Sequence, residues 1–214
     1  MKKAILTLAL LFVFTSMAFA SPLTDYSAEN TSIDITWRPN TSMTNKYTSD
    51  MFGTSSDTFD GKRGIFDWSV TTGFGNDFAI QYSQYRPEGR YDYGMNTKEL
   101  NVLYKMNKNM SVFAGYHRAG FIGDYVDNKT SCLQAGIIAY NKVAEKTTLY
   151  GLVGAGEKML NWEVGVSQEV AKNLELNFNY RYKRVQDFST EYYGTTYKED
   201  IIAKGFGYGV TYKF

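Results

Sequence analysis

Residues 174–183 are Leu174-Glu-Leu-Asn-Phe-Asn-Tyr-Arg-Tyr-Lys183, in which every second side chain is apolar or aromatic and each one between them is polar. Side chains alternate between the two faces of a β-strand, whereas a helix would mix these residues around its circumference. The stretch therefore predicts a strand with one apolar face and one charged or amide face.

The preceding strand is joined to this one by residues 171–173, Ala-Lys-Asn, which favour a turn. A three-residue turn sets Val170 opposite Leu174, and the same register sets Glu163 opposite Arg181. Acid then faces base on one side of the hairpin, while apolar side chains face one another on the other side. This agreement is expected of two strands that fold together.

Similar segments of about ten residues recur from Ile65 onward, separated by turn-forming residues, as is typical of a membrane β-barrel. We expect an all-β fold, an antiparallel up-and-down transmembrane β-barrel of ten strands. Because the first strand is short and ends before Pro39, a barrel of eight strands with an irregular N-terminal segment is the alternative. The expected strands are residues 32–38, 65–74, 78–87, 97–106, 110–119, 130–141, 147–156, 159–170, 174–185 and 203–214.

The connections between these strands alternate in length, apart from a short one at residues 157–158. Outer-membrane barrels have short turns at the periplasmic rim and longer loops outside. The expected periplasmic turns are residues 75–77, 107–109, 143–146 and 171–173, and the expected extracellular loops are residues 38–64, 88–96, 120–129 and 186–202. The first loop is long enough to extend the strands outward, fold into the mouth of the barrel or remain mobile.

Residues 1–20 have the features of a secretory signal peptide. Lys2 and Lys3 precede an apolar run of 11 residues, and Ala18-Phe19-Ala20 supplies small residues for cleavage. A helix needs about 20 apolar residues to span a bilayer, so this run is too short to remain as an anchor. We expect export and a mature barrel domain at residues 21–214.

Composition narrows the function classes. Cleavage removes Lys2 and Lys3 from the 23 basic residues and none of the 22 acidic ones, which leaves 21 against 22. Without a basic excess, nucleic acid is not an expected partner. Cys132 is the only cysteine, which excludes an intramolecular disulfide and a structural zinc cluster.

The final strand separates aromatic residues from glycines. One face has Phe206, Tyr208, Val210, Tyr212 and Phe214, and the other has Gly205, Gly207 and Gly209. Glycines weaken a strand that is exposed to solvent, but in a narrow lumen they leave room for bulky or charged neighbours. We therefore expect the aromatic face to meet lipid, and large aromatics near strand ends suit the boundary between lipid and water.

The chain ends with Tyr212 and Phe214 alternating with polar residues, which resembles the C-terminal assembly signal of bacterial outer-membrane proteins. With the export segment and the strand pattern, the mature chain resembles the small outer-membrane β-barrel families, which are the porin-like, opacity-like and OmpA-like proteins. The resemblance implies a location in the outer membrane in contact with its lipid. It also implies delivery by periplasmic chaperones and insertion by the barrel assembly machinery.

The polar face is expected to line the lumen. Its candidate residues are Asp34, Asp67, Gln81, Asn101, Lys105, Glu163, Glu169, Glu175, Asn179, Arg181, Lys183 and Lys213. Barrels of about 8 strands are filled by side chains and wide channels appear near 16, so ten strands favour a satisfied polar plug over a conducting pore. Glu169 and Glu175 face each other in the predicted hairpin and need Lys105 or Lys213 nearby.

His117 is the only histidine, so any nucleophile activated by histidine would depend on it. Lipid A deacylases and omptin proteases are outer-membrane enzymes with a catalytic histidine, but residues 115–120 lack the neighbouring serine of the former and the aspartate of the latter. We expect no enzyme activity, no cofactor and no metal. A three-residue turn at 107–109 points His117 into the lumen, whereas a two-residue turn points it to lipid.

The expected extracellular loops are rich in tyrosine. The candidate recognition residues are Tyr91, Tyr93, Tyr125, Tyr192, Tyr193 and Tyr197. Tyrosine is favoured at recognition surfaces, although these residues could equally pack together as a cap. We predict a porin-like barrel that is structural or weakly conducting for small solutes, and the alternative is a surface adhesion or ligand-binding protein.

Overall fold

The computed structural model describes residues 22–49, 51, 53–61, 64–89, 93–123, 128–192 and 195–214. The predicted signal peptide, residues 1–20, lies outside the described residues. The structure is all β. Within the described ranges, no helix is long and apolar enough to cross a bilayer.

The described residues form twelve strands. They are β1 (Thr31–Arg38), β2 (Thr41–Ser49), β3 (Gly53–Asp60), β4 (Ile65–Gly75), β5 (Phe78–Tyr85), β6 (Gly94–Asn107), β7 (Met110–Ile122), β8 (Lys129–Ala144), β9 (Thr147–Gly156), β10 (Met159–Ala171), β11 (Leu174–Tyr192) and β12 (Thr195–Lys213).

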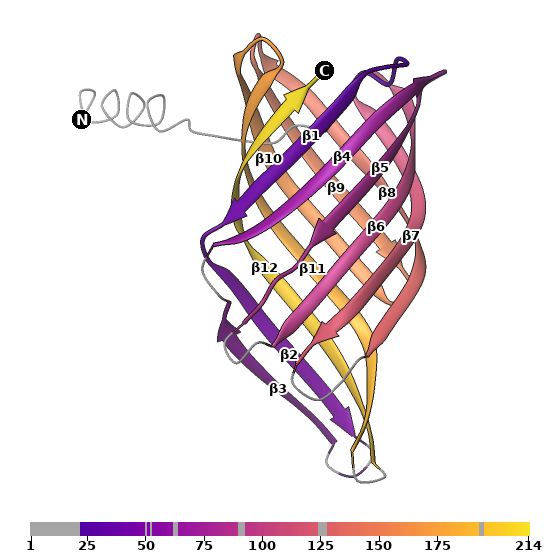
Figure 1. The fold of residues 1–214 in the computed structure, drawn as a ribbon, viewed down its shortest axis with the longest axis vertical. Helices are drawn as coiled ribbons and strands as arrows, with labels where there is room; N and C mark the ends of the chain where they lie inside the picture. The colour runs from indigo at the N-terminus through magenta and orange to yellow at the C-terminus, as the bar shows by residue number, and fades with distance from the viewer. Residues whose placement is uncertain are drawn as a thin grey trace, which may run out of the picture.

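Ten of these strands, β1 and β4 to β12, close into an antiparallel barrel, with β2 and β3 as an addition (Figure 1). The ring closes where β1 pairs with β12, from Ser32 opposite Lys213 to Trp37 opposite Tyr208. The prediction of a ten-stranded barrel is confirmed. The eight-stranded alternative is wrong because the short first strand does pair on both edges.

The two additional strands continue strands of the ring. β12 pairs with β1 through residues 208–213 and with β2 through residues 197–205, so β1 and β2 lie end to end along the same neighbour. β3 pairs with β2, and β4 pairs with β1, in the same antiparallel sense. The described residues of the segment 38–64 thus extend the strands outward, one of the three alternatives that the sequence left open.

Pairing extends further than predicted at the same end of the barrel. β11 and β12 continue as a hairpin from Val185 opposite Ile201 to Tyr192 opposite Thr195, so residues 186–202 are mostly strand and the predicted loop is wrong. β6 also begins earlier, at Gly94, and pairs there with Ile122 of β7. In both hairpins the two strands go on pairing with each other past the end of the ring, so their backbone groups stay hydrogen-bonded there.

The opposite end carries the tight turns and Phe214, and we call it the turn end (top in Figure 1). Asn76 and Asp77 have φ of 53° and 63° there, and a two-residue type I′ hairpin turn requires positive φ at both of its central residues. In the hairpin of β10 and β11, Glu163 lies opposite Arg181 as predicted. The predicted pairing of Val170 with Leu174 is wrong, because a bulge brings Ala171 opposite Leu174.

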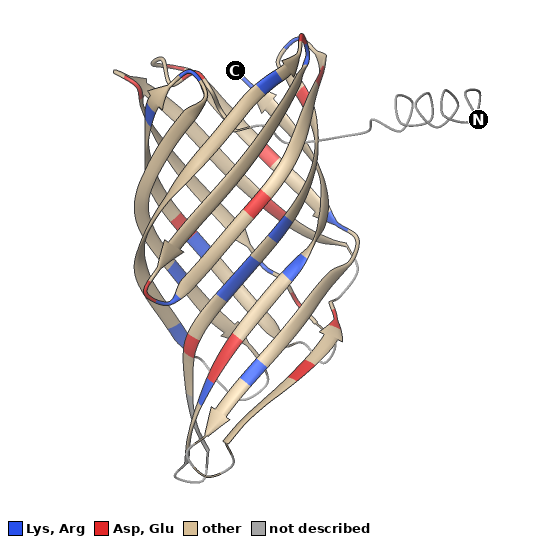
Figure 2. Ribbon diagram, turned by 180° about the vertical axis from the view of Figure 1, so that it is seen from behind, with Lys and Arg blue, Asp and Glu red and all other residues tan. Residues whose placement is uncertain are grey.

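The outer face of the barrel is apolar. Its exposed large side chains include Ile35, Phe66, Trp68, Leu100, Val102, Tyr116, Leu133, Val153, Val164, Phe206, Tyr208 and Val210. Aromatic rings pack against one another on this face, as where Trp162 stacks on Tyr182 with centroids 5.7 Å apart. Figure 2 shows charged residues of both signs on strands in the middle of the barrel as well as at its ends.

Two apolar clusters fill opposite ends of the interior. The turn-end cluster consists of Leu23, Tyr26, Ala79, Leu103, Phe113, Ile138, Tyr140 and Tyr150. The far-end cluster consists of Met43, Tyr85, Met95, Ala119, Val185, Phe188, Ile201 and Ala203, with Phe59, Tyr93 and Phe121 packed against it. Leu23 and Tyr26 belong to residues 22–30, a segment that precedes β1 and whose Tyr26 carbonyl accepts a hydrogen bond from the Gly75 N–H.

Candidate functional site

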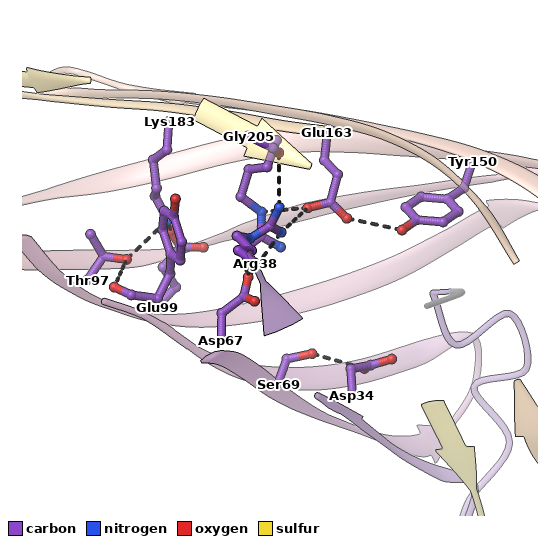
Figure 3. Close-up of polar contacts among 12 residues, drawn as sticks. Asp34, Arg38, Asp67, Ser69, Thr97, Glu99, Tyr150, Glu163, Lys183 and Gly205 are labelled. Atoms are coloured by element: carbon purple, nitrogen blue, oxygen red, sulfur yellow. Dashed lines mark hydrogen bonds and ion pairs between the residues drawn. The ribbon is translucent and has the colours of Figure 1, made fainter. Parts of the chain in front are cut away.

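Between the two apolar clusters, buried ion pairs cross the lumen (Figure 3). Arg38 of β1 donates to Asp67 of β4, with Nη2 and Oδ2 3.1 Å apart, and also lies 3.6 Å from the Glu163 carboxylate of β10. Arg181 of β11 binds the same two carboxylates. Two guanidiniums and two carboxylates therefore neutralise each other inside the barrel.

A separate ion pair spans the full width of the barrel. Lys183 of β11 donates to Glu99 of β6, and four strands separate β6 from β11 in either direction around the ring. Lys183 also lies 3.4 Å from the hydroxyl of Thr97. We call these three basic and three acidic residues the charge layer; they are Arg38, Arg181, Lys183, Asp67, Glu99 and Glu163.

Tyr85 is the member of the far-end cluster that contacts the charge layer. Its ring lies within 5.3 to 6.0 Å of the cationic groups of Arg38, Arg181 and Lys183. Cations are attracted to the face of an aromatic ring at such distances, and more strongly where water is excluded. The ring therefore separates charge from the apolar side chains beyond it.

A glycine of β12 leaves room for the Arg38 guanidinium. A Cβ added at Gly207 would lie 2.8 Å from Arg38 Nη1 and 2.8 Å from Asn179 Oδ1, closer than side chains pack. The carbonyl of Gly205 accepts a hydrogen bond of 3.2 Å from the same guanidinium. The prediction that inward glycines of the final strand make room for charged neighbours is confirmed at Gly207.

Polar side chains continue toward the turn end along β10, β11, β12 and β1. Asp34 accepts hydrogen bonds from the hydroxyls of Ser69, at 2.9 Å, and Thr211. Glu175 forms an ion pair with Lys213, one of the two predicted partners. Glu169 lies opposite Glu175 as predicted and is half-buried.

The other candidate lumen residues lie on the same inner face. Asn101 is buried and accepts a hydrogen bond of 2.7 Å from Gln134, and Gln81 donates to Thr71 at 3.1 Å. Asn179 is buried beside Gly207. Lys105 is half-buried near the turn end.

Two members of the charge layer, Arg38 and Glu99, are absent from the predicted set. The sequence places Arg38 both at the end of the expected strand 32–38 and at the start of the expected loop 38–64, and in the structure it is the last residue of β1, with its side chain buried in the lumen. Glu99 carried a usable signal, since it lies two residues before Asn101 on an expected strand and so on the same face.

His117 points into the lumen with no exposed surface. Its register, opposite Glu99, is the one that a three-residue turn produces. Its Nε2 lies 3.9 Å from Glu99 Oε1, within the sealed part of the interior. Within the described residues, no group of three histidine, cysteine or carboxylate side chains is placed to hold a metal ion.

A cavity of about 110 Å³ adjoins the charge layer on its turn-end side, lined in part by Asp34, Gln81, Asn161 and Tyr150. Tyr150 lies in the cavity wall, and its hydroxyl donates a hydrogen bond of 3.1 Å to the Glu163 carboxylate. One water needs roughly 10 to 15 Å³ of such space and two or more polar partners, so the cavity suits a small water cluster.

Of the candidate recognition tyrosines, two have side chains that the structure describes, both at the far end. Tyr93 packs edge-on between Phe59 and Phe121 and donates to Glu199, and burial together with this hydrogen bond raises the pKa of Tyr93. Tyr197 is half-buried on β12. Tyr91, Tyr125 and Tyr193, and the side chain of Tyr192, lie outside the described residues.

Comparisons with known proteins support the fold. No protein-family model matches the sequence, and no curated protein matches it. The outer membrane protease OmpT from Escherichia coli is similar in structure, with a TM-score of 0.56 over 91% of this chain and 100% of that chain, at 10% identity. The outer membrane protein OprG from Pseudomonas aeruginosa gives a TM-score of 0.40 over 90% of this chain and 99% of that chain, at 13% identity.

At such identities the likeness to OmpT shows the fold alone, and the score for OprG is too low to support an argument. The chain therefore shares its architecture with bacterial outer-membrane β-barrels, and its activity has to be argued from its own residues.

Proposed function

We propose that this chain is an integral protein of the bacterial outer membrane. Its exposed apolar side chains form a band around the barrel, and a contiguous apolar surface of this kind is a liability in water but suits lipid. A closed ring leaves no unpaired strand edge within the hydrocarbon layer. The turn end is then periplasmic and the end bearing β2 and β3 is extracellular.

We further propose that the barrel is structural and closed to solutes in its resting state. The observation that carries this proposal is the filled lumen, in which apolar clusters lie on both sides of a neutral charge layer. An ion entering from the far end would have to cross the far-end cluster, and one entering from the turn end would have to pass the turn-end cluster before it reached the charge layer. Delivery by periplasmic chaperones and the barrel assembly machinery is part of the same proposal.

Planar-bilayer recording of the mature chain, residues 21–214, tests the closed state. We expect the folded protein to give no current steps above the lipid baseline. A matched variant that lacks residues 22–30 and carries Met43→Ser and Phe188→Ser removes packing from both ends and should conduct. Reproducible steps from the unmodified barrel would overturn the proposal.

The extracellular extension favours a second role, in which the barrel displays a recognition surface. β2 and β3 project beyond the ring beside β11 and β12, and nearly every β3 side chain is exposed (Figure 1). Deletion of residues 41–60, with the ring retained, should abolish any binding of cells that express the protein to host surfaces. Binding that survives this deletion would rule out the extension as its source.

A further inference from the structure

Two basic side chains lie directly opposite each other on the outer face. Lys98 of β6 pairs with Arg118 of β7, and both are exposed. Among the described pairings, no other sets two basic residues opposite each other. Like charges at directly opposed positions of a sheet destabilise it, so this arrangement has a cost unless an anion lies between them.

Two other cations toward the far end, by contrast, have acidic partners. Arg184 of β11 binds Asp200, and Arg86 at the end of β5 binds Glu88, with Nε and Oε1 2.6 Å apart. Neither Lys98 nor Arg118 forms an ion pair with a carboxylate in the part of the chain that the structure describes. The neighbours of the pair along the same row are Gln84 and Ser131, which carry no charge.

An apolar row lies directly beneath the basic pair. Leu100, Tyr116 and Leu133 face one another across β6, β7 and β8, two residues closer to the barrel centre, and they are 49%, 49% and 77% exposed. Two residues of a strand span about 7 Å. Positive charge therefore lies one row above a lipid-facing apolar surface, at the extracellular side of the band.

We infer that Lys98 and Arg118 bind the phosphate of a lipid headgroup in the extracellular leaflet, while the acyl chains of that lipid lie over Leu100, Tyr116 and Leu133. A phosphate between the two cations would remove their repulsion, and an arginine guanidinium can bind two of its oxygens. This inference rests on the proposed location in a membrane. It adds a specific lipid class to that proposal.

Native mass spectrometry of the refolded barrel in detergent tests the inference. The probe is an equimolar mixture of dioleoyl phosphatidic acid and dioleoyl phosphatidylcholine. We expect phosphatidic acid adducts to exceed phosphatidylcholine adducts about tenfold, since each basic side chain near a membrane surface adds attraction for anionic lipid. In Lys98→Gln/Arg118→Gln the two lipids should bind equally.

A control variant carries Lys198→Gln and Lys204→Gln. It loses the same charge from exposed outward positions of β12, where the opposed residues are uncharged. This variant should retain the preference for phosphatidic acid. Loss of the preference in the control would show a general charge effect and overturn the paired site.

Two further outcomes separate the possible failures. If inorganic phosphate stabilises the barrel through Lys98 and Arg118 as strongly as phosphatidic acid does, the site binds a free anion and the lipid inference is wrong. If a barrel that folds only with detergent or lipid shows no lipid preference, the inference fails but the membrane location stands. Folding in buffer without any amphiphile would contradict the membrane location itself.

Discussion

Each basic residue of the charge layer binds one or more carboxylates of other strands in the ring. Arg38 and Arg181 share Asp67 and Glu163, whereas Lys183 has Glu99. Removing one partner of a buried pair leaves an uncompensated charge, which costs more than the pair itself contributes. The layer is therefore most sensitive to single substitutions that unbalance it.

The pair of Lys183 and Glu99 makes this testable. We expect Glu99→Gln and Lys183→Met each to lower the free energy of unfolding by about 3 to 5 kcal/mol, because each leaves the charge of its partner buried without a counter-charge. The double variant should lose less than the sum of the two. Tryptophan fluorescence during urea unfolding in lipid vesicles measures the three differences, and additive losses would show that the residues do not interact.

Gly207 gives a prediction about space. In Gly207→Ala the new methyl group meets Arg38 and Asn179 at 2.8 Å, so we expect the free energy of unfolding to fall by about 1 to 3 kcal/mol. Gly120→Ala on β7 is the matched control, since its nearest neighbour is 4.0 Å away. Equal stability of the two variants would indicate that Arg38 moves aside without cost.

At the residue scale, alternation predicted which side chains face inward better than which ones meet. The pairing of Glu163 with Arg181 follows from the local register of one hairpin, which the sequence pattern predicts. The contact of Lys183 with Glu99 joins strands on opposite sides of the ring, and no local pattern encodes which residues meet across a lumen. The acid partner could be found only after the ring had closed.

At the scale of single elements, turns and strand ends differ in how well the sequence specifies them. Asn76 and Asp77 indicate a tight hairpin through residue types that tolerate positive φ. The far ends of β11 and β12 have no such marker. Most of their residues are polar although they are paired in strands, and a polar stretch of sequence resembles a loop. This is why residues 186–202 were predicted as a loop.

The turn between β4 and β5 supplies the prediction at this scale. Asp77 is exposed and has φ of 63°, which glycine adopts more easily. Asp77→Gly should raise the free energy of unfolding by roughly 0.5 kcal/mol. Lys108→Gly, in a turn position without positive φ, should lower it slightly. Thermal unfolding of both variants measures the shifts, and a fall for Asp77→Gly would contradict the turn geometry.

At the scale of the whole molecule, the last residue bears on assembly. Phe214 is 62% exposed and packs on Tyr212 with ring centroids 4.9 Å apart. We expect Phe214→Ala to change the stability of the refolded barrel by less than about 1 kcal/mol, as for other surface substitutions. In cells, however, it should reduce the amount in the outer membrane several-fold if Phe214 is part of an assembly signal.

Phe206→Ala is the control. Phe206 is also on the outer face and half-exposed, but it lies away from the end of the chain, within β12. Fractionation and the heat-dependent mobility of the folded barrel on gels measure both variants. A similar loss for the two would assign the effect to lipid contact and not to the chain end.

The seam between β1 and β12 also fixes the order of folding events. Asp34 and Thr211, which meet across it, are 177 residues apart in the chain, whereas the other neighbours in the ring are hairpins or the continuation of one. Contacts between distant segments form slowly, because the entropy of a large loop is lost before they are made. We expect the hairpins to zip first and the seam to close last. Until then two strand edges stay open, and the rate of this one step sets how long the unclosed chain is vulnerable to aggregation.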